Sequence, residues 1–323
     1  MRYILQRLVY GALLMLGVVV MNFLLIHAVP GDVADVIAGE MGGLSEEAMA
    51  RIRAEYGLDQ PLLSQLWLYL SRVLTGDLGM SYQFNRPVTE MILQRLWPTV
   101  LLAVSAQVVA IVLGVTLGVL ASRRPQGVLS GFVSVFATVG YAAPVFWTGM
   151  MLVILLAVQW PLFPVEGMVS ARFRGTGLAY ALNVAHHLVL PALTLGILFM
   201  AQYARLALAS MIEVLGADYI RTARAKGLPE RRVVFHHALR NAVLPILTIA
   251  GLQFGNLISG ALLVETVFNW PGMGRLAFDS VLRRDYSTLL GILIFSSAVV
   301  VVVNLLTDLS YRLADPRIRG GGR

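Results

Sequence analysis

Six long stretches without a charged side chain divide this chain, and they restrict its fold more than any other feature. They are Leu8–Gly31, Leu96–Ser122, Pro125–Val165, Gly175–Ala204, Asn241–Val264 and Tyr286–Thr307. Each is longer than the roughly 20 residues that a helix needs to cross about 30 Å of hydrocarbon. Only 13% of the residues are charged and 58% are hydrophobic, whereas about 25% charged is usual in soluble domains. The chain is therefore predicted to be an all-α integral membrane protein with six transmembrane helices.

The distribution of charge predicts the orientation of these helices. With six spans and both termini in the cytoplasm, the inner side holds 15 basic and 5 acidic residues, and the outer side 10 basic and 13 acidic. This asymmetry follows the positive-inside rule. The stretch Pro125–Val165 is long enough for two short spans, but a seventh span would place the basic segment Arg205–Arg240 outside. We therefore expect one span there, kinked at Pro144, and we expect no nucleic-acid binding.

The segments between the spans predict the domain organisation. Residues 1–29 form the N-terminus and first span, and residues 30–95 a small extracytoplasmic helical segment. Residues 96–315 form the transmembrane core with a cytoplasmic loop at 210–240, and residues 316–323 a cytoplasmic tail. In the outer segment Ser45 is expected to cap one helix, Pro61 to start a second and Pro87 a third. This segment is either a structural lid or a docking surface for an external partner.

Several kinds of chemistry are missing from the sequence. Ion-coupled carriers generally bury ionisable groups near the middle of the membrane, whereas Arg205, Glu265 and Asp308 lie at the ends of spans, where an interfacial position explains them. A phosphate-binding loop needs Gly-Lys-Ser/Thr after a glycine-rich turn, and the single lysine, Lys226, precedes Gly227. There is no cysteine, and the histidines do not have metal-binding spacing. The chain is predicted to be a non-catalytic membrane subunit without a metal or cofactor of its own.

The segment Ser210–Arg240 is polar and basic, yet it contains more than charge. Asp218–Lys226 predicts one helix, and Gly227 permits a sharp reversal that a β-carbon would hinder. Pro229 suits the first position of a second helix, and Glu230 suits its positive end. A loop that only obeys the positive-inside rule would need none of these residues. We therefore expect a helix pair that docks into a groove on another protein.

Two stretches of this segment match a known family. They are DYIRTARAKG at Asp218–Gly227 and HALRNAVLP at His237–Pro245. They resemble permease subunits of bacterial ABC importers, in the first-permease branch that serves dipeptides, oligopeptides, glutathione or nickel. The same branch is resembled by MRYILQRL at the start of the chain, GLDQPL at 57–62, GDLG at 76–79 and VFNWPGMGRL at 267–276. The resemblance therefore covers nearly the whole chain.

The wider family has a cytoplasmic signature of Glu-Ala-Ala, three residues, Gly, nine residues, then Ile-x-Leu-Pro. In this chain only Ala223, Gly227 and Leu239 match that general form, whereas the peptide branch's own version matches almost throughout. The resemblance implies an ATPase-coupling loop whose residues are Arg221, Thr222, Ala223, Gly227, Leu228, Pro229, Glu230, His237, Leu239 and Arg240.

The resemblance also implies partners. They are a second, usually different, permease subunit, two cytoplasmic ABC ATPases and an extracytoplasmic substrate-binding protein, all at the bacterial cytoplasmic (inner) membrane. ATP and magnesium would be bound by the ATPases, and this chain would contact membrane lipid.

The substrate remains open at this stage, with short peptides favoured over nickel or glutathione. Nickel would favour histidine or methionine ligands along the path, and the spans contain no histidine cluster. A peptide needs neutral polar groups, which Tyr141, Gln202, Gln253 and Asn256 would supply as a tentative translocation path. The alternatives from other classes are an ion-coupled secondary transporter or channel, and a membrane scaffold or enzyme. Only the ABC importer requires ATPases that co-purify with the chain.

Overall fold

The computed structural model describes residues 2–28, 35, 38–39, 43, 45–56 and 58–314. They form two compact units, one made of Met1–Trp97 with Leu276–Arg323 and the other of Pro98–Arg275. Five of the described helices are long and apolar enough to cross a membrane, or six if one bent pair counts as a single span. This agrees with the predicted helical membrane protein. A two-stranded hairpin, β1 (Met80–Ser81) with β2 (Arg86–Pro87), is an addition that the sequence did not predict.

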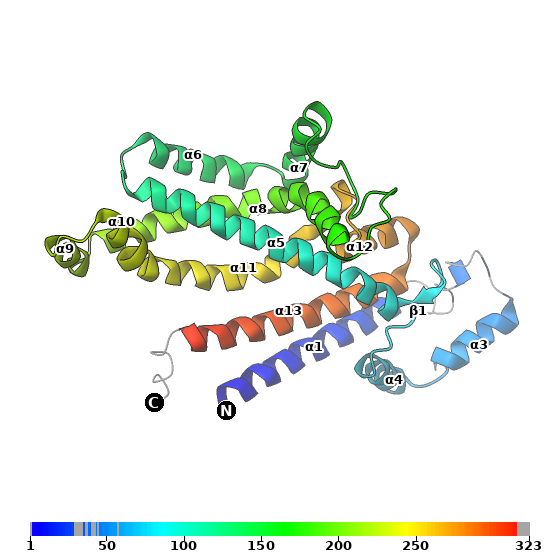
Figure 1. Cartoon of the computed structure of the whole chain (residues 1–323). Helices are drawn as coiled ribbons and strands as arrows, with labels where there is room; N and C mark the ends of the chain where they lie inside the picture. Colours follow the sequence, from blue (N-terminus) through cyan, green and yellow to red (C-terminus); the bar gives the residue numbers. More distant parts are fainter. Residues whose placement is uncertain are drawn as a thin grey trace. The chain divides into compact units, whose positions relative to one another are not determined.

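The first unit is built on two membrane helices, α1 (Arg2–Ala28) and α13 (Tyr286–Ala314), which lie side by side in Figure 1. Asp285 begins α13 as a buried cap. Its carboxylate accepts hydrogen bonds from the Thr288 N–H at 3.0 Å and from the Ser81 hydroxyl at 2.6 Å. The cap therefore also fixes the β hairpin at the start of α13.

Two shorter helices, α3 (Glu46–Tyr56) and α4 (Leu62–Leu74), follow α1 in the chain. The predicted cap of α3 is confirmed, since the Ala48 N–H donates to the Ser45 hydroxyl at 3.3 Å. The helix expected after Pro87 is not a separate element. It is the first part of α5 (Val88–Ser122), which continues without a break into the predicted second span.

The second unit contains the rest of α5 and the helices α6 (Val128–Ala142), α7 (Val145–Val153), α8 (Gly177–Leu215) and α11 (Leu239–Val267), and it reaches the start of α12 (Met273–Arg283). A wide π-helical segment, η1 (Ile154–Gln159), continues α7. The kink predicted at Pro144 is a complete break, because α6 and α7 meet at 109° across extended residues. A residue before proline avoids the helical region, so the chain leaves the helix at Ala143.

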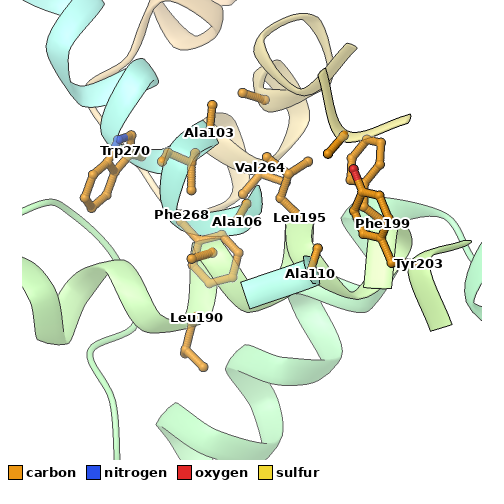
Figure 2. Close-up of a cluster of buried hydrophobic side chains, with 14 of the residues drawn as sticks. Ala103, Ala106, Ala110, Leu190, Leu195, Phe199, Tyr203, Val264, Phe268 and Trp270 are labelled. Carbon is orange, nitrogen blue, oxygen red and sulfur yellow. The ribbon is translucent and has the colours of Figure 1, made fainter. Parts of the chain in front are cut away.

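The main hydrophobic core of this unit lies between α5, α8 and α11. Figure 2 shows Ala103, Ala106 and Ala110 along α5, facing Leu195 and other large side chains of α8. Small side chains let helix backbones approach closely, which is the usual way membrane helices associate. Within this core the Gln107 amide donates hydrogen bonds to the Tyr203 hydroxyl and the Ala250 carbonyl oxygen, both at 3.0 Å. One polar side chain thus connects all three helices.

Gly114 and Gly118, which are spaced as in the GxxxG packing motif, lie in α5 against the backbone of α8. A methyl group on Gly114 would lie 2.7 Å from the Met200 carbonyl oxygen. On Gly118 it would lie 2.5 Å from the Ala204 carbonyl oxygen and 2.6 Å from Ala207 Cβ. Two of these neighbours are backbone atoms, which cannot rotate away as a side chain would.

Gly118→Ala is therefore expected to lower the apparent melting temperature of the purified protein in detergent. Overpacking of this kind typically costs about 1–3 kcal/mol. The matched control is Gly131→Ala in α6, where an added methyl meets nothing within 4 Å. Since alanine is the better helix former, the control should melt at the same temperature or higher. Equal melting temperatures for the two variants would contradict the proposed close contact.

Candidate functional site

The basic segment between α8 and α11 does not form a separate helical hairpin, because its second half is continuous with α11. Helix α8 extends to Leu215, and α9 (Asp218–Ala225) follows after a short turn. A short helical turn, α10 (Glu230–Arg232), then leads through a π-helical segment, η2 (Val233–Ala238), directly into α11. Figure 1 shows α9 and α10 extending beyond the ends of α8 and α11. We call residues 217–240 the coupling loop, after the role that the sequence resemblance implies for them.

Gly227 makes the reversal between α9 and α10. Its φ angle is +74°, in the left-handed region that glycine enters without strain. The Gly227 N–H donates to the Arg224 carbonyl oxygen at 2.9 Å and closes the end of α9. A β-carbon at this position would meet no other atom within 4 Å. The glycine is thus explained by the backbone within this chain, and the space around it is open to another molecule.

An ion pair braces the reversal from both sides of Gly227. The Arg224 guanidinium donates two hydrogen bonds to the Glu230 carboxylate, at 2.8 and 3.2 Å. These hydrogen bonds and the charge of Arg224 hold the pKa of Glu230 below its ordinary value. Pro229 is the N-cap of α10, so Glu230, not Pro229, takes the first helical position. The sequence predicted Pro229 itself at this first helical position, so α10 begins one residue later than expected.

The inner face of the coupling loop is apolar and fixes it to the membrane helices. Ile220 and Val233 are fully buried and Val234 nearly so, in a cluster that includes Val119 of α5 and Met211 of α8. The Asn241 amide also donates to the Tyr219 hydroxyl at 2.8 Å, which connects α9 to the start of α11. The loop is therefore held against the cytoplasm-facing ends expected for α5 and α8.

The predicted coupling residues divide between the two faces. Ala223 is buried, and Leu228 and Leu239 are partly buried against the apolar cluster. His237 is also partly buried, and the exposed members are Arg221, Thr222, Gly227, Pro229, Glu230 and Arg240. Arg224 was not among the predicted residues. Nothing in the sequence predicts that Arg224, three residues before Gly227, pairs with Glu230.

Reversing either charge of the Arg224–Glu230 pair is expected to weaken coupling to a partner more than it weakens folding. Because both side chains are about half exposed, the pair should contribute at most about 1 kcal/mol to stability. Arg224→Glu and Glu230→Arg should each reduce transport with little change in melting temperature, and the double swap should recover part of the activity. Transport that is normal in both single variants would show that the brace is dispensable.

This ion pair also has a predictable pH dependence. Because the pKa of Glu230 is lowered, the ion pair contributes fully to the free energy of unfolding above the ordinary pKa of a carboxyl group. This contribution is lost as the pH falls through the lowered pKa of Glu230. The brace should therefore persist at every pH near neutrality.

Two of the four predicted path residues are brought together. The Gln253 amide on α11 donates to the Gln202 amide oxygen on α8 at 2.9 Å, and both side chains are partly buried. Tyr141 belongs to α6 and Asn256 to α11, but their side chains lie outside the part that the structure describes.

Glu265 corrects the expectation that ionisable groups at span ends are merely interfacial. It lies in the last turn of α11 and is completely buried. Its carboxylate accepts hydrogen bonds from the Thr99 hydroxyl at 2.6 Å and the Arg275 N–H at 3.1 Å. Thr99 in turn accepts from the Met273 N–H at 2.8 Å. Glu265 therefore organises the turn between α11 and α12.

The same turn contains most of the sequence VFNWPGMGRL. Trp270 is fully buried, and its indole N–H donates to the Pro98 carbonyl oxygen at 2.9 Å. Gly272 lies against the Glu265 carboxylate, where a β-carbon would collide with it. This stretch is thus a structural anchor for the C-terminal end of α11.

Arg205 lies within α8, ten residues before the helix ends, and its side chain is exposed. The side chain of Asp308 is not among those described.

His186 and His187 have hydrogen-bond partners within the chain. His186 lies 2.9 Å from the Leu162 carbonyl oxygen, and His187 lies 2.8 Å from that of Asn183. The rings of His236 and His237 pack edge-on at 5.3 Å. No group of three or more metal-ligating side chains occurs among the described residues.

Comparison with known proteins gives a consistent result along the whole chain. Residues 110–320 match the family described as "Binding-protein-dependent transport system inner membrane component", and residues 1–103 match the N-terminal region of such components. The dipeptide transport system permease protein DppB of Escherichia coli K12 is 40% identical over 99% of both chains. The probable peptide ABC transporter permease protein y4tP of Sinorhizobium fredii is 42% identical over 98% of this chain and 99% of its own.

A third relative is the oligopeptide transport system permease protein AppB of Bacillus subtilis, which is 36% identical over 98% of both chains. Among solved structures, the inward-facing MetNI methionine ABC transporter gives a TM-score of 0.55 over 70% of this chain and 96% of that chain, at 15% identity. At that identity the likeness concerns the fold alone.

Proposed function

Because the chain belongs to the family of binding-protein-dependent transport system inner membrane components, we propose that it is the permease subunit of an ATP-driven importer of short peptides. Membership makes it a membrane subunit of a transport system at the inner membrane, which replaces the stand-alone channel and scaffold hypotheses. The full-length similarity to peptide and dipeptide permeases supports the substrate class.

The coupling loop is the observation that carries the mechanism. Its inner face is fixed by an apolar cluster, its reversal is braced by Arg224 and Glu230, and its outer face presents exposed polar and basic side chains around Gly227. A protrusion that is rigid and open on one side is suited to a groove on a partner. We propose that this partner is a cytoplasmic ATPase, which binds the ATP and magnesium.

Movement would then pass from the ATPases to the membrane helices. The loop continues through η2 into α11 without a non-helical residue between them. Its apolar cluster also contacts α5 and α8. A displacement of the loop would therefore tilt the helices as rigid bodies, which is a common way to alternate access. No chemical step is required of this chain.

The remaining partners are a second permease subunit and an external substrate-binding protein, with the termini and the coupling loop in the cytoplasm. Gln202 and Gln253 are proposed to lie on the path, since neutral amide side chains can exchange their mutual hydrogen bond for one to a peptide backbone.

Uptake by cells tests the substrate class. Deleting the gene in its native host should lower accumulation of a radiolabelled dipeptide, and a plasmid copy should restore it. Nickel and glutathione uptake, measured in the same strains, should not change. If only nickel or only glutathione accumulation fell, the peptide assignment would be wrong while the coupling mechanism would remain.

A further inference from the structure

Helix α4 carries a stripe of four large apolar side chains, of which three are largely exposed and Leu70 is partly buried. Leu63, Trp67, Leu70 and Leu74 recur at helical spacing, so they share one face. Leu63 is 81% exposed, Trp67 72% and Leu74 83%. Isolated exposed apolar residues are common, whereas a continuous row of this size usually marks a contact surface.

The opposite face of α4 fixes the helix to the end of α1. Gln65 Oε1 lies 2.9 Å from His27 Nε2, and the rings of Phe23 and Tyr69 lie 6.1 Å apart. Burial raises the pKa of the Tyr69 phenol above its ordinary value. Because Gln65 and Tyr69 point toward α1, the stripe must point away from it.

These contacts also set the depth of α4. The apolar span of α1 is Leu5–Leu25, and α4 meets α1 at Phe23 and His27, where that span ends. In Figure 1 α4 is seen end-on and α1 from the side, so α4 runs across the axis of α1. A helix that crosses the end of a membrane span lies in the plane of the membrane surface.

The exposed side chains of α1 near its contact with α4 indicate that lipid covers the stripe. Met21 is 60% exposed, Leu24 60% and Leu25 49%, as expected for side chains that face lipid. Helix α4 contacts α1 through Phe23 and His27, which lie in the same turns of α1 as these lipid-facing side chains. Tryptophan is also enriched at the boundary between lipid and water.

We propose that α4 is an interfacial helix whose Leu63–Leu74 stripe is embedded in the lipid of the outer leaflet. Amphipathic helices bind membranes in this way when an apolar face lies in the membrane plane. The helix would hold the outer end of α1, and the hairpin that follows it, at a fixed height above the bilayer. This inference goes beyond the proposed transport function and does not depend on the substrate or the ATPase.

The chain contains no cysteine, so no native cysteine has to be removed from it before single-cysteine variants are made. Leu63→Cys, Trp67→Cys and Leu74→Cys, with Asp59→Cys as an exposed control before the helix, would carry a nitroxide label in the full transporter reconstituted into liposomes. Molecular oxygen, which concentrates in lipid, and a neutral nickel chelate, which stays in water, serve as the two relaxation probes. Paramagnetic relaxation then reports the surroundings of each label.

The three stripe positions should show an oxygen-to-nickel accessibility ratio several-fold higher than that of position 59. Low accessibility to both probes would place a protein partner on the stripe, and high nickel accessibility would place it in water. Either result would overturn the proposal. A scan of every position from 62 to 75 adds a second readout, since the ratio should rise and fall with the period of a helix and peak on the stripe. The same labels can be read in the full-length chain reconstituted alone if no ATPase is recovered, so failure of this inference is separate from failure of the proposed function.

Discussion

Gly227→Asp is expected to abolish transport while the chain still folds and inserts into the membrane. Gly227 has a φ angle of +74°, and a non-glycine residue in the left-handed region costs roughly 1–2 kcal/mol. Aspartate is among the residues that tolerate this region best, so the backbone penalty should be small. The larger effect comes from a side chain placed where a partner is proposed to approach, and from a negative charge on a basic surface.

The matched control is Gly216→Asp, which introduces the same side chain before the coupling loop. Gly216 has an ordinary negative φ of −82°, and an added β-carbon would make only normal contacts there. Dipeptide uptake should fall to background for Gly227→Asp and stay close to wild type for Gly216→Asp, with equal amounts of both in the membrane. Normal uptake by Gly227→Asp would refute the docking role of the loop.

Trp270→Ala should produce the largest loss of stability among single substitutions in the second unit. Trp270 is the largest of the fully buried side chains, and its indole N–H donates to the Pro98 carbonyl oxygen. Replacing a buried tryptophan by alanine typically costs about 3–5 kcal/mol. We expect a strongly lowered melting temperature in detergent, or loss of the protein from the membrane fraction.

Two further variants separate the causes. Trp270→Phe keeps most of the volume but removes the hydrogen bond, so it should fall between the wild type and Trp270→Ala. Trp160→Ala removes the same side chain from a site that is 62% exposed and should change the melting temperature little. A similar loss for Trp160→Ala and Trp270→Ala would mean that the anchoring turn is not specially important.

The sequence was most predictive where a single physical constraint dominates. Long uncharged stretches predicted the membrane helices because hydrocarbon excludes charge and requires a minimum length. Gly227 predicted a reversal because few other residues adopt a positive φ, and the structure places one there. Ser45 predicted a cap because its hydroxyl suits an unpaired backbone N–H, and that hydrogen bond is present.

The sequence was least predictive where the outcome depends on contacts between distant residues. Glu265 at the end of an apolar run was interpreted as interfacial, since nothing nearby suggests that Thr99, 166 residues away, donates to its carboxylate. The pairing of Arg224 with Glu230 depends on how Gly227 brings two short helices together. Pro144 was expected to kink a span, but the extent of the 109° bend is not encoded in the proline alone.

For the α4 helix, the sequence did not predict which apolar face is buried and which is exposed. The spacing of Leu62, Leu66, Tyr69 and Val73 predicts one apolar face for this helix. Leu66, Tyr69 and Val73 are partly buried, whereas Leu62 is 62% exposed. The sequence did not show that a second apolar row, Leu63 to Leu74, would point outward, because apolar residues surround much of this helix. Only its attachment to α1 distinguishes the two faces.

The most direct test of the central claim is a mild-detergent pull-down of the tagged full-length chain from its native membrane, with partners identified by mass spectrometry. The wild type should recover a second six-span permease and one or two ATPases with phosphate-binding loops. Gly227→Asp should retain the permease and lose the ATPases. Recovery of the wild-type chain alone, under conditions that keep a control ABC transporter intact, would contradict the account.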